Sequence, residues 1–174
     1  MKTTSSQSYD KASSKVRKNY QSAEASLQNF LSEMPVVYHK QPITFEQFFA
    51  NKFLIIQTIR KGISYRFFEQ IKAVLPFSDT DWANYLNLSL KTLQRHKKDK
   101  DFHFKPIHTE KIIELAEVTH HGKEVFGSLD KFHQWLETPS YALGNMKPAD
   151  LLNDSYGKDL VLAELNRIAH GIFA

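Results

Sequence analysis

The sequence contains no cysteine and only six glycines in 174 residues. Without cysteine there is no disulfide framework, no thiolate zinc site and no thiol nucleophile, which agrees with a reducing compartment, and we expect a cytoplasmic protein. There is no run of 18 uninterrupted apolar residues, and the N-terminal residues lack an apolar segment. We therefore expect neither a membrane span nor a signal peptide.

Long alternating runs of β-branched residues are also scarce, which disfavours a β-sheet. Apolar residues instead recur at helical spacing, between Ser or Thr residues that can start helices and Gly or Pro residues that can stop them. Hydrophobic residues make up 41% of the chain, enough for a real core. The sequence thus predicts an all-α fold: a helical bundle with a helix-turn-helix, followed by a small helical C-terminal domain.

The charge is unevenly distributed along the chain, whose net charge is +4. Residues 1–111 carry 18 Lys and Arg against 10 Asp and Glu, whereas residues 112–174 carry 5 against 9. Such a split favours a polyanionic partner for the first part and a different partner for the second.

The segment 77–98 predicts two short helices joined by a tight turn. Ser78 can cap the first helix, with Asp81 three positions later. Asn87 lies at the turn, where helix-turn-helix units usually have Gly because the backbone needs a positive φ, and Asn is the next most tolerant residue. Ser89 can cap the second helix. The pattern therefore indicates a helix-turn-helix.

The second helix of this unit combines a buried side with a basic one. Leu90 and Leu93 are expected to face the core. Arg can donate two hydrogen bonds to guanine, Gln pairs with adenine, and Ser, Thr and Lys hold phosphates. A helical hairpin with a solvated basic face is the alternative. The predicted DNA-binding residues are Ser89, Lys91, Thr92, Gln94, Arg95, Lys97 and Lys98.

Three regions are predicted along the chain. Residues 1–43 are expected to be a flexible basic N-terminal arm, with at most a marginal helix over 16–33. Residues 44–124 form the helical helix-turn-helix domain, and residues 125–174 form the C-terminal domain. Within the second region, one helix is expected over 44–61, with Phe45, Phe48, Phe49, Phe53 and Ile56 on its buried face, and another over 110–121, ended by Gly122.

A weak histidine cluster is the nearest approach to an enzymatic or metal site. His120, His121 and Glu124 lie close in sequence, but no third convincing ligand is spaced on the same face, so we expect no metal. The P-loop, the Gly-rich dinucleotide turn and the G-x-S-x-G elbow are all missing. We expect no enzyme and no cofactor; a metal-dependent hydrolase built on this cluster is the alternative, which elemental analysis would test.

The C-terminal region contains a series of short runs at ordered spacings: Val125-Phe126-Gly127, Trp135-Leu136, Pro139, Leu143-Gly144, Pro148, Leu151-Leu152, Gly157, Val161, Leu165, Arg167-Ile168 and Gly171. Two earlier runs, Gly62-Ile63-Ser64 and Thr92-Leu93-Gln94-Arg95, belong to the same series. In these residues, which span about 60–174, the chain resembles the Xre/MbcA/ParS-type antitoxins, and its C-terminal region resembles their toxin-binding domain.

The sequence departs from the family pattern at several positions. Asn145 follows Gly144 where a second Gly is usual, and Asn153-Asp154 replaces a Thr-type helix entry. His96 and Lys97 alter the basic pair after Arg95. These departures concern partner choice and operator sequence more than the fold.

The resemblance implies two activities, neither of them catalytic. Family members pair with RES-domain toxins that act on NAD, cover the toxin's cleft through the C-terminal domain, and repress their own operator, for which a homodimer is expected. A helix-turn-helix transcriptional regulator without a toxin partner is the alternative. By analogy, the toxin-binding residues are Trp135, Leu143, Arg167, Ile168, His170, Ile172 and Phe173.

Overall fold

The structure is a computed structural model that describes residues 4–33, 43–99 and 101–172, with side chains from residue 18 onward. These residues form ten α-helices, one 3₁₀ helix and no β-strand, so the predicted all-α class is confirmed. The elements are α1 Thr4–Ser32, α2 Phe45–Ala50, α3 Lys52–Lys61, α4 Tyr65–Lys72, α5 Asp79–Tyr85, α6 Leu90–His96, α7 Pro106–Phe126, α8 Leu129–Leu136, η1 Tyr141–Leu143, α9 Pro148–Leu151 and α10 Ser155–Ala169.

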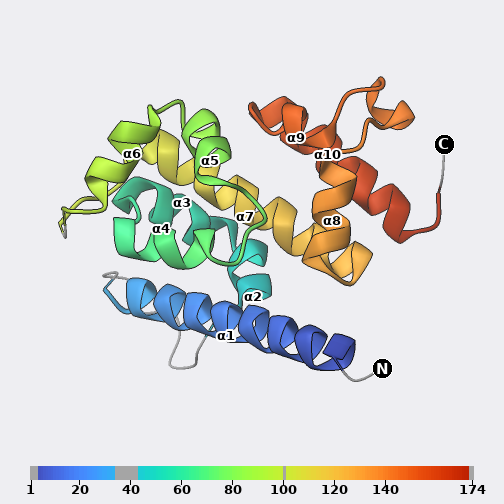
Figure 1. Cartoon of the computed structure of the whole chain (residues 1–174). Coiled ribbons are helices and arrows are strands. Elements are labelled where there is room, and N and C mark those ends of the chain that lie inside the picture. Colours follow the sequence, from blue (N-terminus) through green and yellow to red (C-terminus); the bar gives the residue numbers. More distant parts are fainter. Residues whose placement is uncertain (1–3, 34–42, 100, 173–174) are drawn as a thin grey trace.

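The long helix α7 is the element around which the others are arranged. It contacts α2 and α3 on one side and α8 and α10 on the other, so it runs through the middle of the molecule (Figure 1). Its buried residues lie along most of its length, from Thr109 to Gly122. The predicted boundary between residues 124 and 125 falls inside this helix, which the two predicted domains therefore share.

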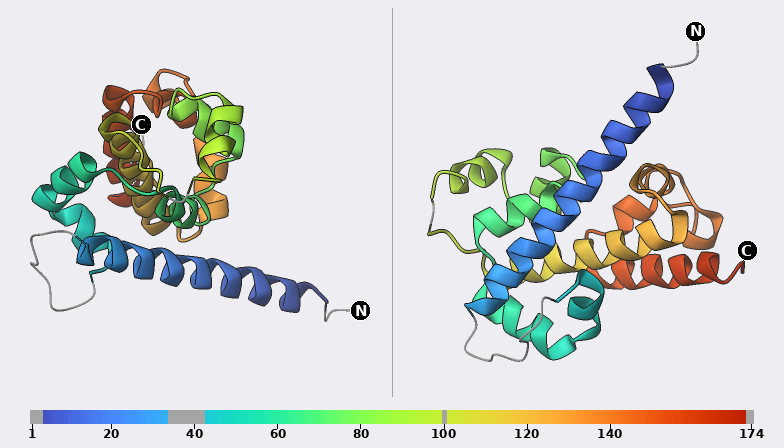
Figure 2. Two further views of the ribbon diagram at one scale, coloured as in Figure 1. Left: turned by 90° about the vertical axis from the view of Figure 1, so that its left-hand side faces the viewer. Right: turned by 90° about the horizontal axis from the view of Figure 1, so that it is seen from below.

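Helix α1 occupies the segment that we expected to be a flexible arm. Ala23, Leu27 and Phe30 are buried, and Phe30 stacks on Phe67 of α4 with 5.4 Å between ring centroids. Their spacing of four and three residues places them on one face, which packs along α4. The N-terminal half of α1 extends past the other helices (Figure 2). The remaining arm residues, 1–3 and 34–42, lie outside the described residues.

The prediction of one helix over residues 44–61 is wrong, because the helix is interrupted at Asn51, which separates α2 from α3. The predicted start is confirmed: Thr44 and Gln47 form a capping box. Asn51 then leaves helical geometry, and its side chain accepts a hydrogen bond from the backbone N–H of Leu54 at 3.1 Å, which caps α3. The break changes which residues face the core, so Phe53 is 80% exposed instead of buried.

Gly122 does not end a helix, as the sequence suggested, but lies buried inside α7. A Cβ atom built on it would lie 2.6 Å from Cγ of Phe132 and closer still to two other ring carbons. Phe132 of α8 is itself fully buried. Glycine is therefore required here for the close approach of α8, and α7 ends five residues later at Gly127, which has a positive φ of 70°.

Candidate nucleic-acid and partner interfaces

The helix-turn-helix predicted from the sequence consists of α5 and α6. Ser78 Oγ accepts a hydrogen bond from the N–H of Asp81 at 3.2 Å, and Asp81 Oδ2 accepts one from the N–H of Ser78 at 2.8 Å. The helix is anchored by Trp82, which is fully buried and meets Phe68 edge-on at 5.0 Å between centroids. This capping box and this aromatic contact fix the position of α5 on the bundle.

The turn between the two helices uses the left-handed conformation expected for Asn87, whose φ is 51°. The N–H of Leu88 then donates to the carbonyl of Ala83 at 2.9 Å, which closes the turn. Asn can adopt this conformation at modest cost, so the departure from Gly is compatible with a regular turn.

Helix α6 begins at Ser89, as predicted, and presents a largely polar surface. Ser89 Oγ accepts from the N–H of Thr92 at 3.0 Å and is also bonded to the Thr92 hydroxyl at 2.7 Å. Leu93 is buried, whereas Leu90 is 38% exposed, so the expectation that both face the core is wrong for Leu90. Leu93 is thus the one fully buried residue of this seven-residue helix.

The cations of α6 differ in what holds them. Lys91, Arg95 and Lys98 are exposed, and so is Gln94. Lys97 instead forms an ion pair with Glu69 of α4 at 3.0 Å between Nζ and Oε1. Six of the seven predicted DNA-binding residues are thus exposed, and Lys97, whose side chain is 63% exposed, is restrained by its ion pair with Glu69.

His96 lies at the end of α6 and faces a neighbouring loop. Its ring stacks on Phe102 with 3.7 Å between centroids. Burial, with a smaller contribution from Arg95, lowers the pKa of His96 below its usual value. The lowered pKa favours the neutral form of the ring, so His96 contributes less positive charge to this surface than Arg95 does.

In the C-terminal part, a tight hairpin carries two exposed apolar side chains. The N–H of Ser140 donates to the carbonyl of Met146 at 3.0 Å, and Asn145 adopts a positive φ of 62° within the turn. Tyr141 is 82% exposed and Met146 is 47% exposed. The Asn145 departure is therefore accommodated by the turn, and the hairpin presents its apolar side chains to solvent.

Helix α10 adds a second pair of exposed apolar side chains. Its buried side is formed by Val161 and Leu165, while Tyr156 is 87% exposed and Leu160 is 55% exposed. Tyr156 and Leu160 are four residues apart, so they lie on one outward face. Ile172, beyond the end of α10, is 55% exposed.

The residues predicted to bind a toxin are divided between the core and the surface. Leu143 is buried, and Trp135 is half-buried against Phe132, with 6.1 Å between ring centroids. Arg167 and Ile168 are half-buried; His170 and Ile172 are exposed, and Phe173 lies outside the described residues.

The exposed side chains of Tyr141, Met146, Tyr156 and Leu160 were not among the candidate residues predicted from the sequence. One signal could have placed Leu160 correctly. Val161, Leu165 and Ile168 are spaced by four and three residues, so they share one face of α10. Leu160 precedes Val161 by one residue, which turns its side chain about 100° away from that face.

Two hydrogen bonds connect the helix-turn-helix unit with the C-terminal part. The Tyr85 hydroxyl on α5 donates to the carbonyl of Ala149 at 3.1 Å. Lys111 Nζ on α7 donates to the carbonyl of Leu152 at 3.2 Å. The two candidate interfaces therefore belong to one continuous structure.

The histidine cluster has local partners. His120 Nε2 lies 3.5 Å from Glu124 Oε1, His121 Nδ1 lies 3.8 Å from Glu124 Oε2, and the His120 ring packs on Phe49. Burial lowers the pKa of His120. In the described part of the chain, no group of three or more His, Cys, Asp or Glu side chains could hold a metal ion.

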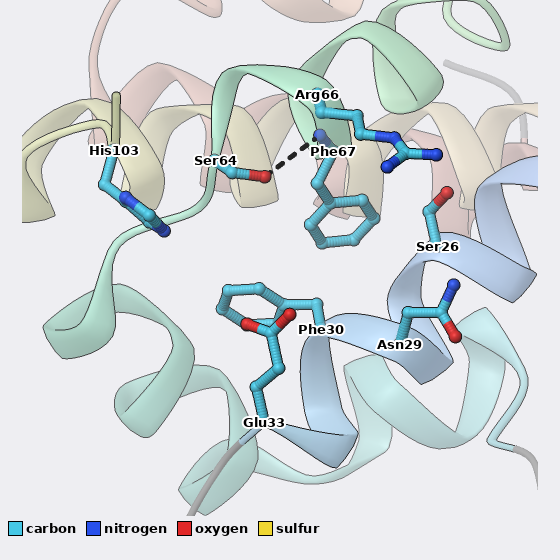
Figure 3. Close-up of a pocket in the computed structure, with 8 residues that line it drawn as sticks. All are labelled: Ser26, Asn29, Phe30, Glu33, Ser64, Arg66, Phe67 and His103. Atoms are coloured by element: carbon cyan, nitrogen blue, oxygen red, sulfur yellow. Dashed lines mark hydrogen bonds between the residues drawn. The ribbon is translucent and has the colours of Figure 1, made fainter. Parts of the chain in front are cut away.

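A pocket of about 270 Å³ lies where α1 meets α4 (Figure 3). Its lining includes the stacked rings of Phe30 and Phe67, and the Ser64 hydroxyl is already used to cap α4. Arg66 and Glu33 bring opposite charges to its rim. Because both charges are present, the pocket does not favour a ligand of one charge. It lies along the contact between α1 and α4.

This arrangement defines a helical protein with a helix-turn-helix and a C-terminal partner-binding domain. Residues 54–117 match the antitoxin Xre-like helix-turn-helix domain, and residues 121–171 match the antitoxin Xre/MbcA/ParS C-terminal toxin-binding domain. The chain belongs to the Xre/MbcA/ParS-type antitoxin family. None of the curated proteins compared with it matches. Among the described residues, no helix is long and apolar enough to cross a membrane.

Proposed function

We propose that this antitoxin neutralises a RES-domain toxin that acts on NAD, by covering the toxin's active site, and that it represses its own operon through α6. It acts in the cytoplasm by binding and not by catalysis. The observation that carries the proposal is the separation of two surfaces: exposed cations on α6, and exposed aromatic and aliphatic side chains in the toxin-binding domain.

Operator recognition is assigned to the free polar side chains of α6. Arg95 and Gln94 supply the donor and acceptor patterns that read guanine and adenine in the major groove, and Lys91 and Lys98 neutralise phosphates. The hydroxyl groups of Ser89 and Thr92 are hydrogen-bonded to each other at the start of α6, so they are less available to bind phosphates. One short helix reads few base pairs, so a homodimer on two half-sites about 34 Å apart is expected.

Toxin binding is assigned to the hairpin and to the outer face of α10. Tyr141, Met146, Tyr156 and Leu160 supply large exposed side chains of the kind that anchor protein interfaces. Arg167 lies in the last turn of α10, and His170 and Ile172 follow the helix. These three residues, together with Phe173, are expected to approach the mouth of the toxin's cleft.

Charge supports the same assignment of the toxin partner. NAD carries negatively charged phosphate groups, so we expect positive charge in the toxin's cleft. Residues 112–174 carry 5 Lys and Arg against 9 Asp and Glu, which complements such a cleft.

The test is co-expression with the RES-domain toxin encoded beside the antitoxin gene, with growth and cellular NAD as readouts. The unmodified chain should restore both, and the double variant Tyr156→Glu/Leu160→Glu should lose both, because two charges enter an apolar contact. Ile107→Glu is the matched control, since Ile107 is 71% exposed at the start of α7 and outside the assigned surface.

Two results would contradict the proposal. If the double variant still restores growth and NAD, the outer face of α10 does not bind the toxin. If no RES-domain toxin is neutralised by the unmodified chain, a transcriptional regulator without a toxin partner becomes the better assignment.

A further inference from the structure

Helix α9 lies between the two pairs of exposed side chains assigned to toxin binding. It has only four residues, Pro148–Leu151. The hairpin that carries Tyr141 and Met146 ends just before it, and α10, which carries Tyr156 and Leu160, follows it. The position of α9 therefore sets how the two pairs are placed relative to each other.

A helix as short as α9 is not stable by itself, so tertiary contacts must hold it in place. Its N-cap residue, Lys147, makes no side-chain capping bond. Pro148 is buried, and Leu152, directly after the helix, is fully buried. A Cβ atom built on Gly157 of α10 would lie 1.9 Å from the carbonyl oxygen of Leu151, so the start of α10 packs directly on the end of α9. Contacts with other elements, more than its own hydrogen bonds, thus hold α9.

Two side chains from the preceding part of the chain bind the end of α9. The last carbonyl groups of a helix find no donor within it. The Tyr85 hydroxyl on α5, which lies on the same side of α7 as α9 (Figure 1), donates to the carbonyl of Ala149 at 3.1 Å. Lys111 Nζ on α7 donates to the carbonyl of Leu152 at 3.2 Å and also pairs with Glu114 at 2.7 Å. The bond from Tyr85 is therefore the one that joins α9 to the helix-turn-helix unit.

The surroundings of Tyr85 suit it to this bond. Its ring meets Phe77 edge-on, with 5.3 Å between centroids, which fixes the direction of the side chain. Burial raises the pKa of the Tyr85 hydroxyl, with smaller contributions from Asp81 and from two carboxylates of the C-terminal part. The hydroxyl therefore keeps its proton and acts as a donor.

The two helices that this bond joins are unequally anchored. Helix α5 is held by Trp82, which is fully buried and meets Phe68 at 5.0 Å and Phe77 at 5.8 Å between centroids. Helix α9 has four residues and no buried aromatic ring of its own. Loss of the bond is therefore expected to release α9 and to leave α5 in place.

We propose that Tyr85 is a positioning residue for toxin binding, because its hydrogen bond to Ala149 fixes α9 and with it the spacing of the two pairs of exposed side chains. The bond crosses from residues 54–117, which match the helix-turn-helix domain, to residues 121–171, which match the toxin-binding domain. A residue of the DNA-binding unit thus determines how well the other domain fits its partner. This inference rests on the proposed function, since it concerns the toxin surface assigned there.

Hydrogen exchange of the free full chain tests the positioning step without toxin. Tyr85→Phe removes only the hydroxyl group and keeps the ring against Phe77. Amides of residues 140–153 should exchange about three- to tenfold faster, as expected for the loss of one hydrogen bond, and amides of α5 should be unchanged. Tyr65→Phe is the matched control, because it removes the hydroxyl of another packed tyrosine, on α4. Faster exchange in α5 but not in residues 140–153 would overturn the proposal.

Binding to the RES-domain toxin encoded beside the antitoxin gene tests the consequence. Well below the unfolding temperature, Tyr85→Phe should bind the toxin about three- to tenfold more weakly than the unmodified chain does. Its affinity for a promoter fragment of the operon should be unchanged, and Tyr65→Phe should alter neither affinity. A merely structural role would lower the unfolding temperature and leave the toxin affinity of the folded chain as it was.

A double-mutant cycle tests whether Tyr85 acts through the side chains that α9 places. Tyr156→Ala removes one of these side chains, so Tyr85→Phe should weaken toxin binding less in the Tyr156→Ala chain than in the unmodified chain. Full additivity of the two changes would mean that they act independently, and it would overturn the positioning role.

The remaining outcomes separate this inference from the proposed function. If the unmodified chain binds the toxin and Tyr85→Phe binds it equally well, only the positioning role fails. If Tyr85→Phe weakens operator binding as much as toxin binding, Tyr85 holds the whole α5–α6 unit, and the inference is wrong. If the unmodified chain does not bind the toxin, the proposed function fails, and the role of Tyr85 in toxin binding fails with it.

Discussion

At the residue scale, Arg95 and Lys97 differ in their surroundings although both are cations of the same short helix. Arg95 is exposed, whereas the Lys97 ammonium group is engaged by Glu69 of α4. An exposed ion pair contributes little to stability, up to about 1 kcal/mol, but it holds the side chain away from a phosphate. The two residues are therefore expected to contribute unequally to operator binding.

Arg95→Ala should cost roughly 1–3 kcal/mol of operator affinity if Arg95 reads a base. Lys97→Ala should cost less, at most about 1 kcal/mol, since its charge is already partly neutralised. Titration of a fluorescent fragment of the operon's own promoter, at two salt concentrations, measures both. Unchanged affinity and an unchanged salt dependence for Arg95→Ala would remove Arg95 from the reading surface.

At the element scale, the contact of α7 with α8 explains a glycine in the middle of a long helix. Alanine is favoured over glycine in a helix interior by about 1 kcal/mol, so propensity alone predicts that Gly122→Ala stabilises α7. The added methyl group, however, would overlap the buried ring of Phe132, and overpacking of this kind costs about 1–3 kcal/mol. The packing effect is the larger one.

Gly122→Ala should therefore lower the free energy of unfolding by about 1 kcal/mol, as the net of these two effects. Urea denaturation followed by circular dichroism measures it. The double variant Gly122→Ala/Phe132→Leu provides the control, because the smaller side chain makes room for the methyl group and the added cost of Gly122→Ala should fall. A more stable Gly122→Ala protein would show that α8 can move away without loss.

At the scale of the whole molecule, three half-buried histidines make the fold sensitive to acid. Burial is the largest cause of the lowered pKa in His96, His108 and His120. A lowered pKa in the folded state means that the unfolded chain, with a His pKa of about 6.5, binds protons first. Stability from these residues is therefore complete above about pH 7 and declines as the pH falls through 6.5 toward the folded pKa values.

The free energy of unfolding should thus decrease between about pH 7 and pH 5. His120→Phe should flatten this dependence, since a phenyl ring can remain packed on Phe49 and takes up no proton. His133→Phe is the matched control, because His133 is exposed. An identical pH dependence for His120→Phe and the unmodified chain would mean that His120 does not contribute.

The sequence by itself determined where five of the described helices begin and which family the chain resembles. The caps by Thr44, Ser64, Ser78, Ser89 and Ser128 are hydrogen bonds to backbone groups within three residues, so they depend on local sequence alone. The positive φ of Asn87 was predictable for the same reason. The antitoxin resemblance was carried by short runs of residues at ordered spacings, which need no coordinates.

Only the tertiary structure decided which side chains are covered, because burial depends on elements distant in sequence. Leu90 and Leu160 resemble core residues by pattern but have no helix over them, whereas Leu143 and Trp135, expected to contact a toxin, pack within their own domain. Gly122 is needed for a ring ten residues away on another helix. Helix α1 is ordered along its second half by α4, which follows it by more than thirty residues, and no local signal could supply that contact.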